Sequence, residues 1–187
     1  MALPEYPMIS VEDYLTLDRH SQEARYEYLD GELRMIAGGS IYHSLIATNV
    51  VGILYGLLRG SPYRVYNSDV RLQLSPSRYV YPDITVSCDQ RDQEPGETIH
   101  FPRVIIEVLS PSTEVIDRIR KFAYYRACPT VQEYVMIDSQ KILVEIYRRE
   151  EDGWLLQTLG PQDQLVFKSL GKQIPIEAIY EGVKLHG

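Results

Sequence analysis

The chain has 187 residues, of which 44% are hydrophobic and 24% are charged, a composition typical of a globular protein and not of a disordered one. We therefore expect residues 1–187 to form a single domain with a sizeable core. The formal net charge of −7 lacks the basic excess that proteins usually need to bind nucleic acid over a broad surface.

Several features favour a cytoplasmic protein that does not enter a membrane. Cys88 and Cys128 show no metal-ligand spacing, which is typical of a reduced, cytosolic chain. Residues 1–5 contain neither a basic segment nor an apolar one, so we expect no signal peptide. Polar side chains interrupt the longest apolar stretch, residues 41–58, which argues against a membrane span.

The first third of the chain predicts a short helix, a hairpin and a longer helix. Ser10 is a typical N-cap for a helix over residues 10–15. Asp30-Gly31 lies between two strand-like segments and is a strong hairpin signal. Apolar residues then recur at helical spacing over residues 41–58.

The middle of the chain predicts three strands and a second helix. The expected strands are residues 63–74, 79–87 and 103–109, and an acidic loop that we expect to be solvated separates the last two. Ser110 followed by Pro111 is typical of a helix start. Four side chains of this helix are expected to face the core: Ile116, Ile119, Phe122 and Ala123.

The remaining chain predicts a strand over residues 131–138, a hairpin turning at residues 151–153, and a short strand with a helical turn over residues 174–183. The helix between strands 103–109 and 131–138 would make this pair parallel. We expect the other pairs to be antiparallel. The predicted fold class is therefore mixed α/β, with an N-terminal hairpin, then helix, three strands, helix and strand, and further C-terminal strands.

Two carboxylates lie within predicted strands. Glu107 stands in an apolar, β-branched run, where an ionised carboxylate is costly unless a cation or a donor satisfies it. Asp83 follows Tyr81-Pro82 in the preceding strand. If the two strands are neighbours, both acids can converge on one hard divalent cation, and Mg²⁺ or Mn²⁺ fits such a donor pair. Asp83 and Glu107 are therefore the candidate metal ligands and catalytic acids.

Each acid also has a structural interpretation. Asp83 after a proline could be a turn residue, and Glu107 could form an ion pair with a buried arginine. The position of Asp83 among strand residues and the burial expected for Glu107 favour a functional role for both.

Lys121 lies 14 residues after Glu107, within the second predicted helix. Its ammonium could stabilise the negative charge that develops in a phosphodiester transition state, and we then expect it to affect turnover and not folding. The alternative is an exposed salt bridge with Asp117, four residues earlier on the same helix.

His43 is the fourth candidate catalytic residue, because the glycine break before its helix would let it approach the acid pair. A core histidine with satisfied hydrogen bonds is the alternative, since His43 shares a helix face with the apolar Val50. Glu27 and Asp69 are weaker candidates as additional acids, because hairpin and strand-edge roles explain them as well.

The order of these elements resembles the PD-(D/E)-x-K nuclease superfamily, with the acid pair on the second and third strands. The superfamily lysine lies two residues after the second acid, where this chain has Leu109. Some members carry the lysine on the following helix instead, and Lys121 is the lysine of this chain in that helix.

A more specific resemblance extends over residues 10–180 and is to the Uma-two family, a group of restriction endonucleases. It rests on the segments YEYLDGE (26–32), His43, YPD (81–83), IEVLSPST (106–113), KFAY (121–124), Glu133-Tyr134 and Asp138. The resemblance implies a restriction-endonuclease-like core, DNA as the substrate, a Mg²⁺ or Mn²⁺ cofactor and a migrated lysine.

Two other function classes stay open at this stage. A non-catalytic nucleic-acid-binding or oligomeric interaction module could share the fold, and the acidic net charge favours that alternative. An enzyme acting on a small anionic substrate could use the two carboxylates as general acid and base without a metal. Metal binding would distinguish the nuclease from both.

The chain contains 15 tyrosines against 3 phenylalanines and 1 tryptophan. Tyrosine suits interfaces, because its ring packs while its hydroxyl keeps a polar partner. We therefore expect a tyrosine-rich surface through which the chain forms a homodimer.

Overall fold

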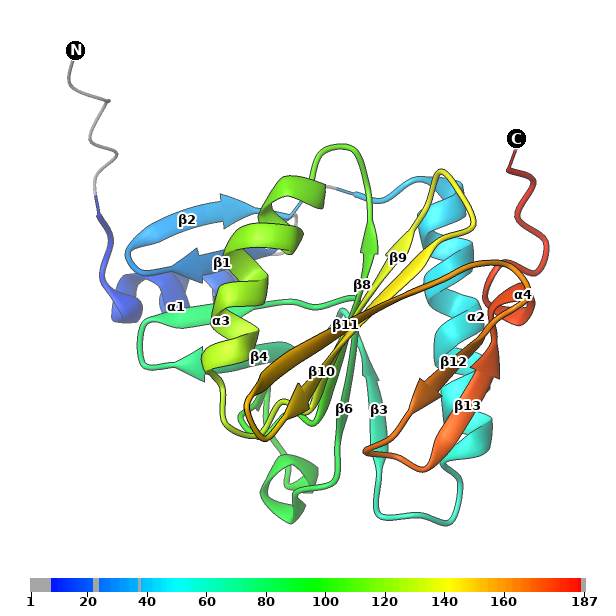
Figure 1. Cartoon of the computed structure of the whole chain (residues 1–187). Helices are drawn as coiled ribbons and strands as arrows, with labels where there is room; N and C mark the ends of the chain where they lie inside the picture. Colours follow the sequence, from blue (N-terminus) through cyan, green and yellow to red (C-terminus); the bar gives the residue numbers. More distant parts are fainter. Residues whose placement is uncertain (1–7, 22–23, 37, 186–187) are drawn as a thin grey trace.

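The computed structural model describes residues 8–21, 24–36 and 38–185, which form two mixed sheets, a small antiparallel sheet and several helices (Figure 1). The mixed α/β class is confirmed, because each of the two larger sheets contains parallel and antiparallel pairs. The helical elements are α1 (Val11–His20), α2 (Ile41–Leu57), a 3₁₀ turn (Gln90–Gln93), a π-helical segment (Ile116–Lys121) that continues into α3 (Phe122–Ala127), and α4 (Ile176–Ile179).

The larger sheet has six strands, and the two main core clusters pack against it. In spatial order they are β11 (Gly153–Leu159), β10 (Val144–Glu150), β9 (Glu133–Asp138), β8 (Val104–Leu109), β6 (Ile84–Ser87) and β3 (Arg64–Asn67). β8 and β9 are parallel, as the intervening helix predicted, and the other pairs of this sheet are antiparallel.

The second sheet brings the N-terminal hairpin against the middle of the chain. In spatial order its strands are β2 (Glu32–Met35), β1 (Tyr26–Leu29), β5 (Arg78–Val80), β4 (Arg71–Ser75) and β7 (Thr98–Ile99). β4 and β7 are parallel, which the sequence did not predict. The third sheet pairs β12 (Gln164–Phe167) with β13 (Lys172–Pro175), just before α4.

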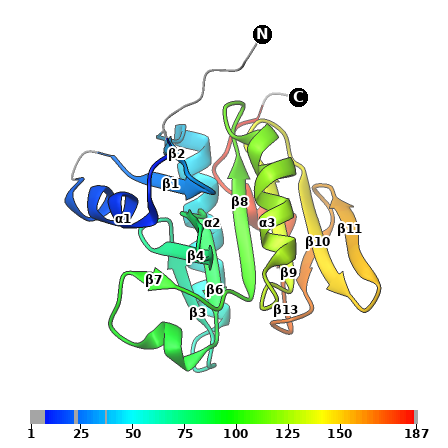
Figure 2. The ribbon, with the colours of Figure 1, turned by 90° about the vertical axis from the view of Figure 1, so that its left-hand side faces the viewer.

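The six-stranded sheet is covered on both faces (Figures 1 and 2). α2 packs on one face, where Ile106 and Val108 of β8 join its apolar residues in one core cluster. The helix that ends in α3 packs on the other face, where Ile105 and Leu109 join Tyr125 in a second cluster. Because side chains alternate along a strand, Glu107 projects from β8 toward the α3 face.

Local signals at the N-terminus are confirmed. The Ser10 side chain caps α1 by accepting a hydrogen bond from the Asp13 backbone amide. Asp30 and Gly31 turn the β1–β2 hairpin with φ values of 54° and 99°. Positive φ at both central positions matches a primed turn, for which Asp-Gly is a preferred pair.

Two expected strands are each divided between the two larger sheets. The expected strand 63–74 breaks at a turn after Asn67 into β3 and β4, and the expected strand 79–87 breaks into β5 and β6. The second break falls at residues 81–83, where Pro82 has no amide hydrogen to donate to a ladder. As a result, Asp83 directly precedes β6 and does not lie inside a strand.

The predicted inward face of the second helix is wrong at Ile119 and Ala123, whereas Phe122 packs against the core as expected. Ile119 is 69% exposed, whereas Asp117, Lys121 and Tyr125 are buried. The helix contains a π-helical segment, whose wider turn shifts the register away from the α-helical spacing that the apolar residues suggested. The buried row of this helix is therefore largely polar and faces Glu107.

Two smaller expectations are also wrong. The acidic loop after β6 is not simply solvated, because the buried Asp92 accepts hydrogen bonds from the Ser87 hydroxyl and from the backbone amides of His100 and Phe101. The tyrosines do not form an exposed surface either: within the described ranges, Tyr55 alone is exposed. No described helix has the length and apolar content needed to cross a membrane.

Candidate active site

The structure brings Asp83 and Glu107 together where β6 meets β8. The two strands pair antiparallel with Ile84 opposite Ile106, so the residue before β6 lies beside the middle of β8. The Asp83 amide points to Glu107 Oε2 at 3.4 Å, and the Val108 amide donates to Asp83 Oδ2 at 2.7 Å. The backbone therefore holds both carboxylates at one point of the sheet.

Glu107 is held by two side chains from the helix above it. The Lys121 ammonium donates to Glu107 Oε1 at 3.0 Å, and the Tyr125 hydroxyl donates to the same oxygen at 2.7 Å. Burial raises the pKa of the Glu107 carboxyl to about 8; Lys121 lowers this pKa, and three neighbouring carboxylates raise it. Both side-chain donors contact Oε1, whereas Oε2 accepts only the long hydrogen bond from the Asp83 amide, so Oε2 is the oxygen with capacity left for a ligand.

This pKa predicts how stability depends on pH when no divalent ion is present. Below about pH 4.5, Glu107 is protonated in both the folded and the unfolded chain. Between about pH 4.5 and 8 the unfolded chain ionises while the folded chain keeps the proton, so the contribution of this residue falls as pH rises. We expect metal-free Glu107→Gln to match wild type near pH 4.5 and to melt several degrees higher at pH 8. Equal melting temperatures of the two proteins at pH 8 would contradict this.

Lys121 lies at the centre of a buried cluster of carboxylates. Its ammonium is 2.8 Å from Glu27 Oε1, 3.0 Å from Glu107 Oε1 and 3.3 Å from Asp117 Oδ1. Burial alone would lower the pKa of Lys121, but the three carboxylates raise it well above its usual value. The salt bridge with Asp117 that was the alternative is present, but it is buried and not exposed. Because a buried ammonium among three carboxylates also bears on folding, this geometry does not support the expectation that Lys121 affects turnover and not folding.

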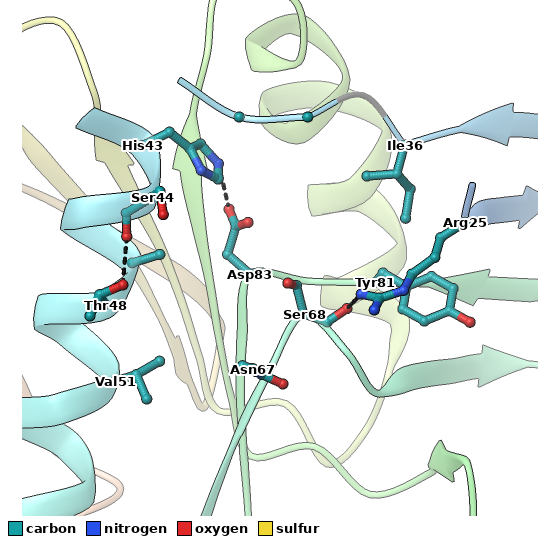
Figure 3. A pocket seen from close by; sticks show the side chains of 13 residues that line it. Arg25, Ile36, His43, Ser44, Thr48, Val51, Asn67, Ser68, Tyr81 and Asp83 are labelled. Atoms are coloured by element: carbon teal, nitrogen blue, oxygen red, sulfur yellow. Dashed lines mark hydrogen bonds and ion pairs between the residues drawn. The ribbon is translucent and has the colours of Figure 1, made fainter. Parts of the chain in front are cut away.

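His43 reaches the acid pair from the first turn of α2. Its Nε2 atom is 3.3 Å from Asp83 Oδ2 (Figure 3). The hydrogen bond to Asp83 raises the pKa of His43, although burial opposes this increase. Gly39 lies against the other side of the ring, where a Cβ atom would be 2.5 Å from Nδ1. The glycine before α2 thus makes room for the histidine.

Three buried residues of the site were missed or underrated from the sequence. Glu27 comes from the N-terminal hairpin, where it accepts from the Tyr81 backbone amide at 3.2 Å and binds Lys121. Asp117 and Tyr125 lie four residues to either side of Lys121, and this polar i, i+4 row is the signal that could have identified them. Asp69, the other weak candidate, lies elsewhere: it pairs with Arg25 at the surface.

Two adjoining cavities open at the acid pair. The smaller one has a volume of about 120 Å³, and its walls include Glu27, His43, Asp83, Glu107, Asp117 and Lys121. The larger one, of about 550 Å³, shares His43, Tyr81 and Asp83 with it (Figure 3). The arrangement therefore joins a small, strongly acidic chamber to a wider pocket that a larger molecule could enter.

The donor set suits a hard divalent cation that keeps much of its water. In the described part of the chain, no three histidine, cysteine, aspartate or glutamate side chains are placed to enclose a metal ion. Mg²⁺ needs no such cage, because one or two carboxylates plus water and substrate oxygens complete its octahedron. The contacts to Asp83 from Val108 and His43 are on Oδ2, which leaves Asp83 Oδ1 and Glu107 Oε2 as the fitting ligand atoms.

Comparison with protein families gives a match over most of the chain. Residues 11–177 match the Uma2 family, described as "Putative restriction endonuclease". Two uncharacterized proteins of Synechocystis sp. are also similar. One is 34% identical over 180 residues, covering 95% of this chain and 94% of the relative. The other is 31% identical over 172 residues, covering 89% and 97%.

Comparison with solved structures supports the fold. The crystal structure of "a putative nuclease belonging to DUF820" from Anabaena variabilis aligns with a TM-score of 0.76. The alignment covers 92% of this chain and 98% of that one, at 19% sequence identity. At this identity, the likeness establishes a shared fold and carries no information about the substrate.

Proposed function

This chain belongs to the Uma2 family, and we propose that it is a metal-dependent endonuclease that hydrolyses DNA phosphodiester bonds. The observation that carries the proposal is the pair Asp83 and Glu107, held side by side against an acidic cavity, where no described side chain contacts Asp83 Oδ1 or Glu107 Oε2. Family membership supports the reaction class, and the two carboxylates supply a reason for metal dependence.

Asp83 Oδ1 and Glu107 Oε2 are the atoms that would hold Mg²⁺ or Mn²⁺. When bound, such an ion polarises a phosphoryl oxygen and lowers the pKa of a water ligand, which supplies the nucleophile. The protein holds the two carboxylates that would bind the ion in fixed positions. The Val108 amide and His43 restrain Asp83, and Tyr125 and Lys121 restrain Glu107.

We propose His43 as a proton carrier at the edge of the site. It is the candidate residue that contacts Asp83 and lines both cavities. Because its pKa is raised, His43 keeps a proton on Nε2 nearer to neutral pH than a free histidine. A protonated imidazole in this position can donate to a leaving or bridging oxygen.

The larger cavity is the proposed place for the DNA strand next to the scissile phosphate. It joins the small cavity at Asp83, and its walls include the hydroxyls of Ser44, Thr48 and Ser68 and the guanidinium of Arg25. Such groups commonly contact phosphate and sugar oxygens, which positions a strand without reading its sequence.

We also propose that the core is restriction-endonuclease-like. Along the chain, α2, β3, β6, β8, the helix ending in α3, and β9 occur in the order that the resemblance implied, with β4, β5 and β7 of the second sheet inserted between them. This proposal treats residues 1–187 as one domain, which stays a prediction.

Divalent metal should stabilise the folded protein. An ion that binds the folded state but not the unfolded one raises stability by mass action, by about 2.7 kcal/mol at a concentration 100 times the dissociation constant. We expect Mg²⁺ or Mn²⁺ to raise the melting temperature of wild type by several degrees and to leave Glu107→Gln unchanged. Glu114→Gln, in an ion pair with Arg118, is the matched control and should keep the shift. Equal shifts in wild type and Glu107→Gln would contradict a metal site at this acid.

A homodimer stays a prediction. Its first argument, an exposed tyrosine surface, does not hold, because the described tyrosines other than Tyr55 are buried or half-buried. Two-fold pairing is nonetheless the commonest closed symmetry, and β11 ends the six-stranded sheet with Leu155 and Leu156 exposed. Light scattering should give twice the chain mass of 21.6 kDa. A monomer mass over a wide concentration range would refute the prediction.

A further inference from the structure

We infer that the Lys121 ammonium takes the place of a second metal ion, with Glu27 and Asp117 as the positioning residues that hold it. The inference rests on the proposed function and assigns Lys121 a role within it. Lys121 would then be a fixed internal cation, and not a group that reaches out to the substrate.

The Lys121 ammonium is surrounded by carboxylates inside the protein. An ammonium has three N–H donors and no acceptor. Three carboxylate oxygens, from Glu27, Glu107 and Asp117, lie within 2.8–3.3 Å of the nitrogen. The side chain of Lys121 is 7% exposed, and the carboxylate side chains are 3–5% exposed. The contact to Glu107 is a hydrogen bond and the other two are ion pairs, so the buried ammonium is surrounded by carboxylates and Lys121 acts through them.

Glu107 has the arrangement of a carboxylate that bridges two cations. Its Oε1 atom binds the ammonium, while Oε2 faces Asp83 at the proposed divalent site. In two-metal sites the cations lie about 3.5–4 Å apart and commonly share ligands. Here one position of the pair is filled by a charge that belongs to the chain itself.

The charges around the cavity need this second cation. Glu27, Asp83, Glu107 and Asp117 carry up to four negative charges, and a single divalent ion neutralises two of them. Asp117 shows most clearly that positive charge is needed here. Its buried Oδ1 atom has no hydrogen-bond partner of good geometry among the described residues, and it lies 3.3 Å from the Lys121 ammonium. The ammonium supplies the positive charge that the acid cluster would otherwise take from solution.

Glu27, Glu107 and Asp117 form an enclosure around the Lys121 nitrogen, and its size suits an ammonium. Its nitrogen–oxygen distances of 2.8–3.3 Å exceed the metal–oxygen distances of about 2.0–2.1 Å for Mg²⁺ and 2.3–2.6 Å for Ca²⁺. With the lysine removed, the three carboxylate oxygens would have to move inward by about 0.7–1.3 Å to bind Mg²⁺ directly, and by about 0.2–1.0 Å to bind Ca²⁺.

The test counts bound Mn²⁺ in two variants that both lose the charge but differ in the space they leave. Lys121→Ala opens the enclosure, whereas Lys121→Met fills it with an apolar chain of similar length. Mn²⁺ binding is measured by calorimetry and by electron paramagnetic resonance, with circular dichroism to check the fold. We expect one ion in wild type, two in Lys121→Ala, and one in Lys121→Met. Adding Glu27→Gln to Lys121→Ala should weaken the second ion at least tenfold.

The outcomes decide the inference without any DNA being cut. An additional ion in Lys121→Ala, absent from Lys121→Met, supports it. So does a Lys121→Ala protein that is unfolded alone and is refolded by Mn²⁺. The same ion count in wild type and Lys121→Ala overturns it, as does a Lys121→Ala protein that no concentration of Mn²⁺ refolds. If wild type binds no ion, the proposed function fails, while the difference between the two variants still tests the enclosure.

Discussion

Replacing Lys121 by methionine should lower the free energy of unfolding by about 3–5 kcal/mol, because it leaves buried carboxylates without their counter-ion. The three carboxylates around the ammonium are each almost fully buried, so water cannot take over its role. For a chain of this size, such a loss lowers the melting temperature by about 2–4 °C per kcal/mol. Urea denaturation at pH 8, about the pKa of Glu107 in the folded chain, should give a larger difference from wild type than denaturation at pH 5, where this carboxyl is protonated.

The matched control is Lys168→Met. Lys168 also pairs with a glutamate, Glu150, but its side chain is 62% exposed. An exposed pair contributes about 0–1 kcal/mol, so this variant should unfold close to wild type. If Lys121→Met were as stable as Lys168→Met, Lys121 could not be the counter-ion of a buried acid cluster.

Replacing Asp83 by asparagine should reduce the rate of metal-dependent DNA cleavage by about a thousandfold or more. The change removes one of the two charged ligands, and with it several kcal/mol of transition-state stabilisation by the ion. Each 1.36 kcal/mol corresponds to a tenfold change in rate. Asparagine keeps the size of the side chain, so the fold should persist.

Single-turnover cleavage at saturating metal measures this effect. Asp152→Asn, in the exposed turn between β10 and β11, is the control and should cleave at the wild-type rate. A rate for Asp83→Asn within threefold of wild type would exclude Asp83 as a metal ligand.

The parts of the fold that follow from short-range pattern were predictable. The apolar run around Glu107 identified the central strand β8, and Asp30-Gly31 identified the N-terminal hairpin. The helix between β8 and β9 correctly implied a parallel pair. In each case the local preference of the chain and the demands of the core agree.

The candidate acid pair follows from the same reasoning, although Asp83 occupies a different element from the one expected. Its strand ends at Val80 and resumes at Ile84, because Pro82 breaks the ladder between two sheets. Alternation of side chains along the strands places Asp83 near Glu107 only if the two strands are neighbours. The sequence alone could not show this, and the pairing of β6 with β8 confirms it.

The environment of Lys121 could not be predicted in the same way. The apolar residues Ile116 and Ile119 suggested an inward helix face that differs from the observed one, in which Asp117 and Lys121 are buried in a π-helical segment. Glu27 reaches Lys121 through contacts between segments far apart in the sequence, which no local pattern reports. The helix therefore buries Asp117 and Lys121 beside Glu107, a face that the apolar pattern alone does not predict.

Cleavage of DNA at this site with a divalent ion can be measured with purified wild-type protein and supercoiled plasmid DNA. We expect nicked and linear DNA to appear with Mg²⁺ or Mn²⁺, a chelator to prevent their formation, and added metal to restore it. Plasmid, linear duplex and single-stranded DNA that all stay intact with both metals would contradict this expectation and favour a non-catalytic binding module.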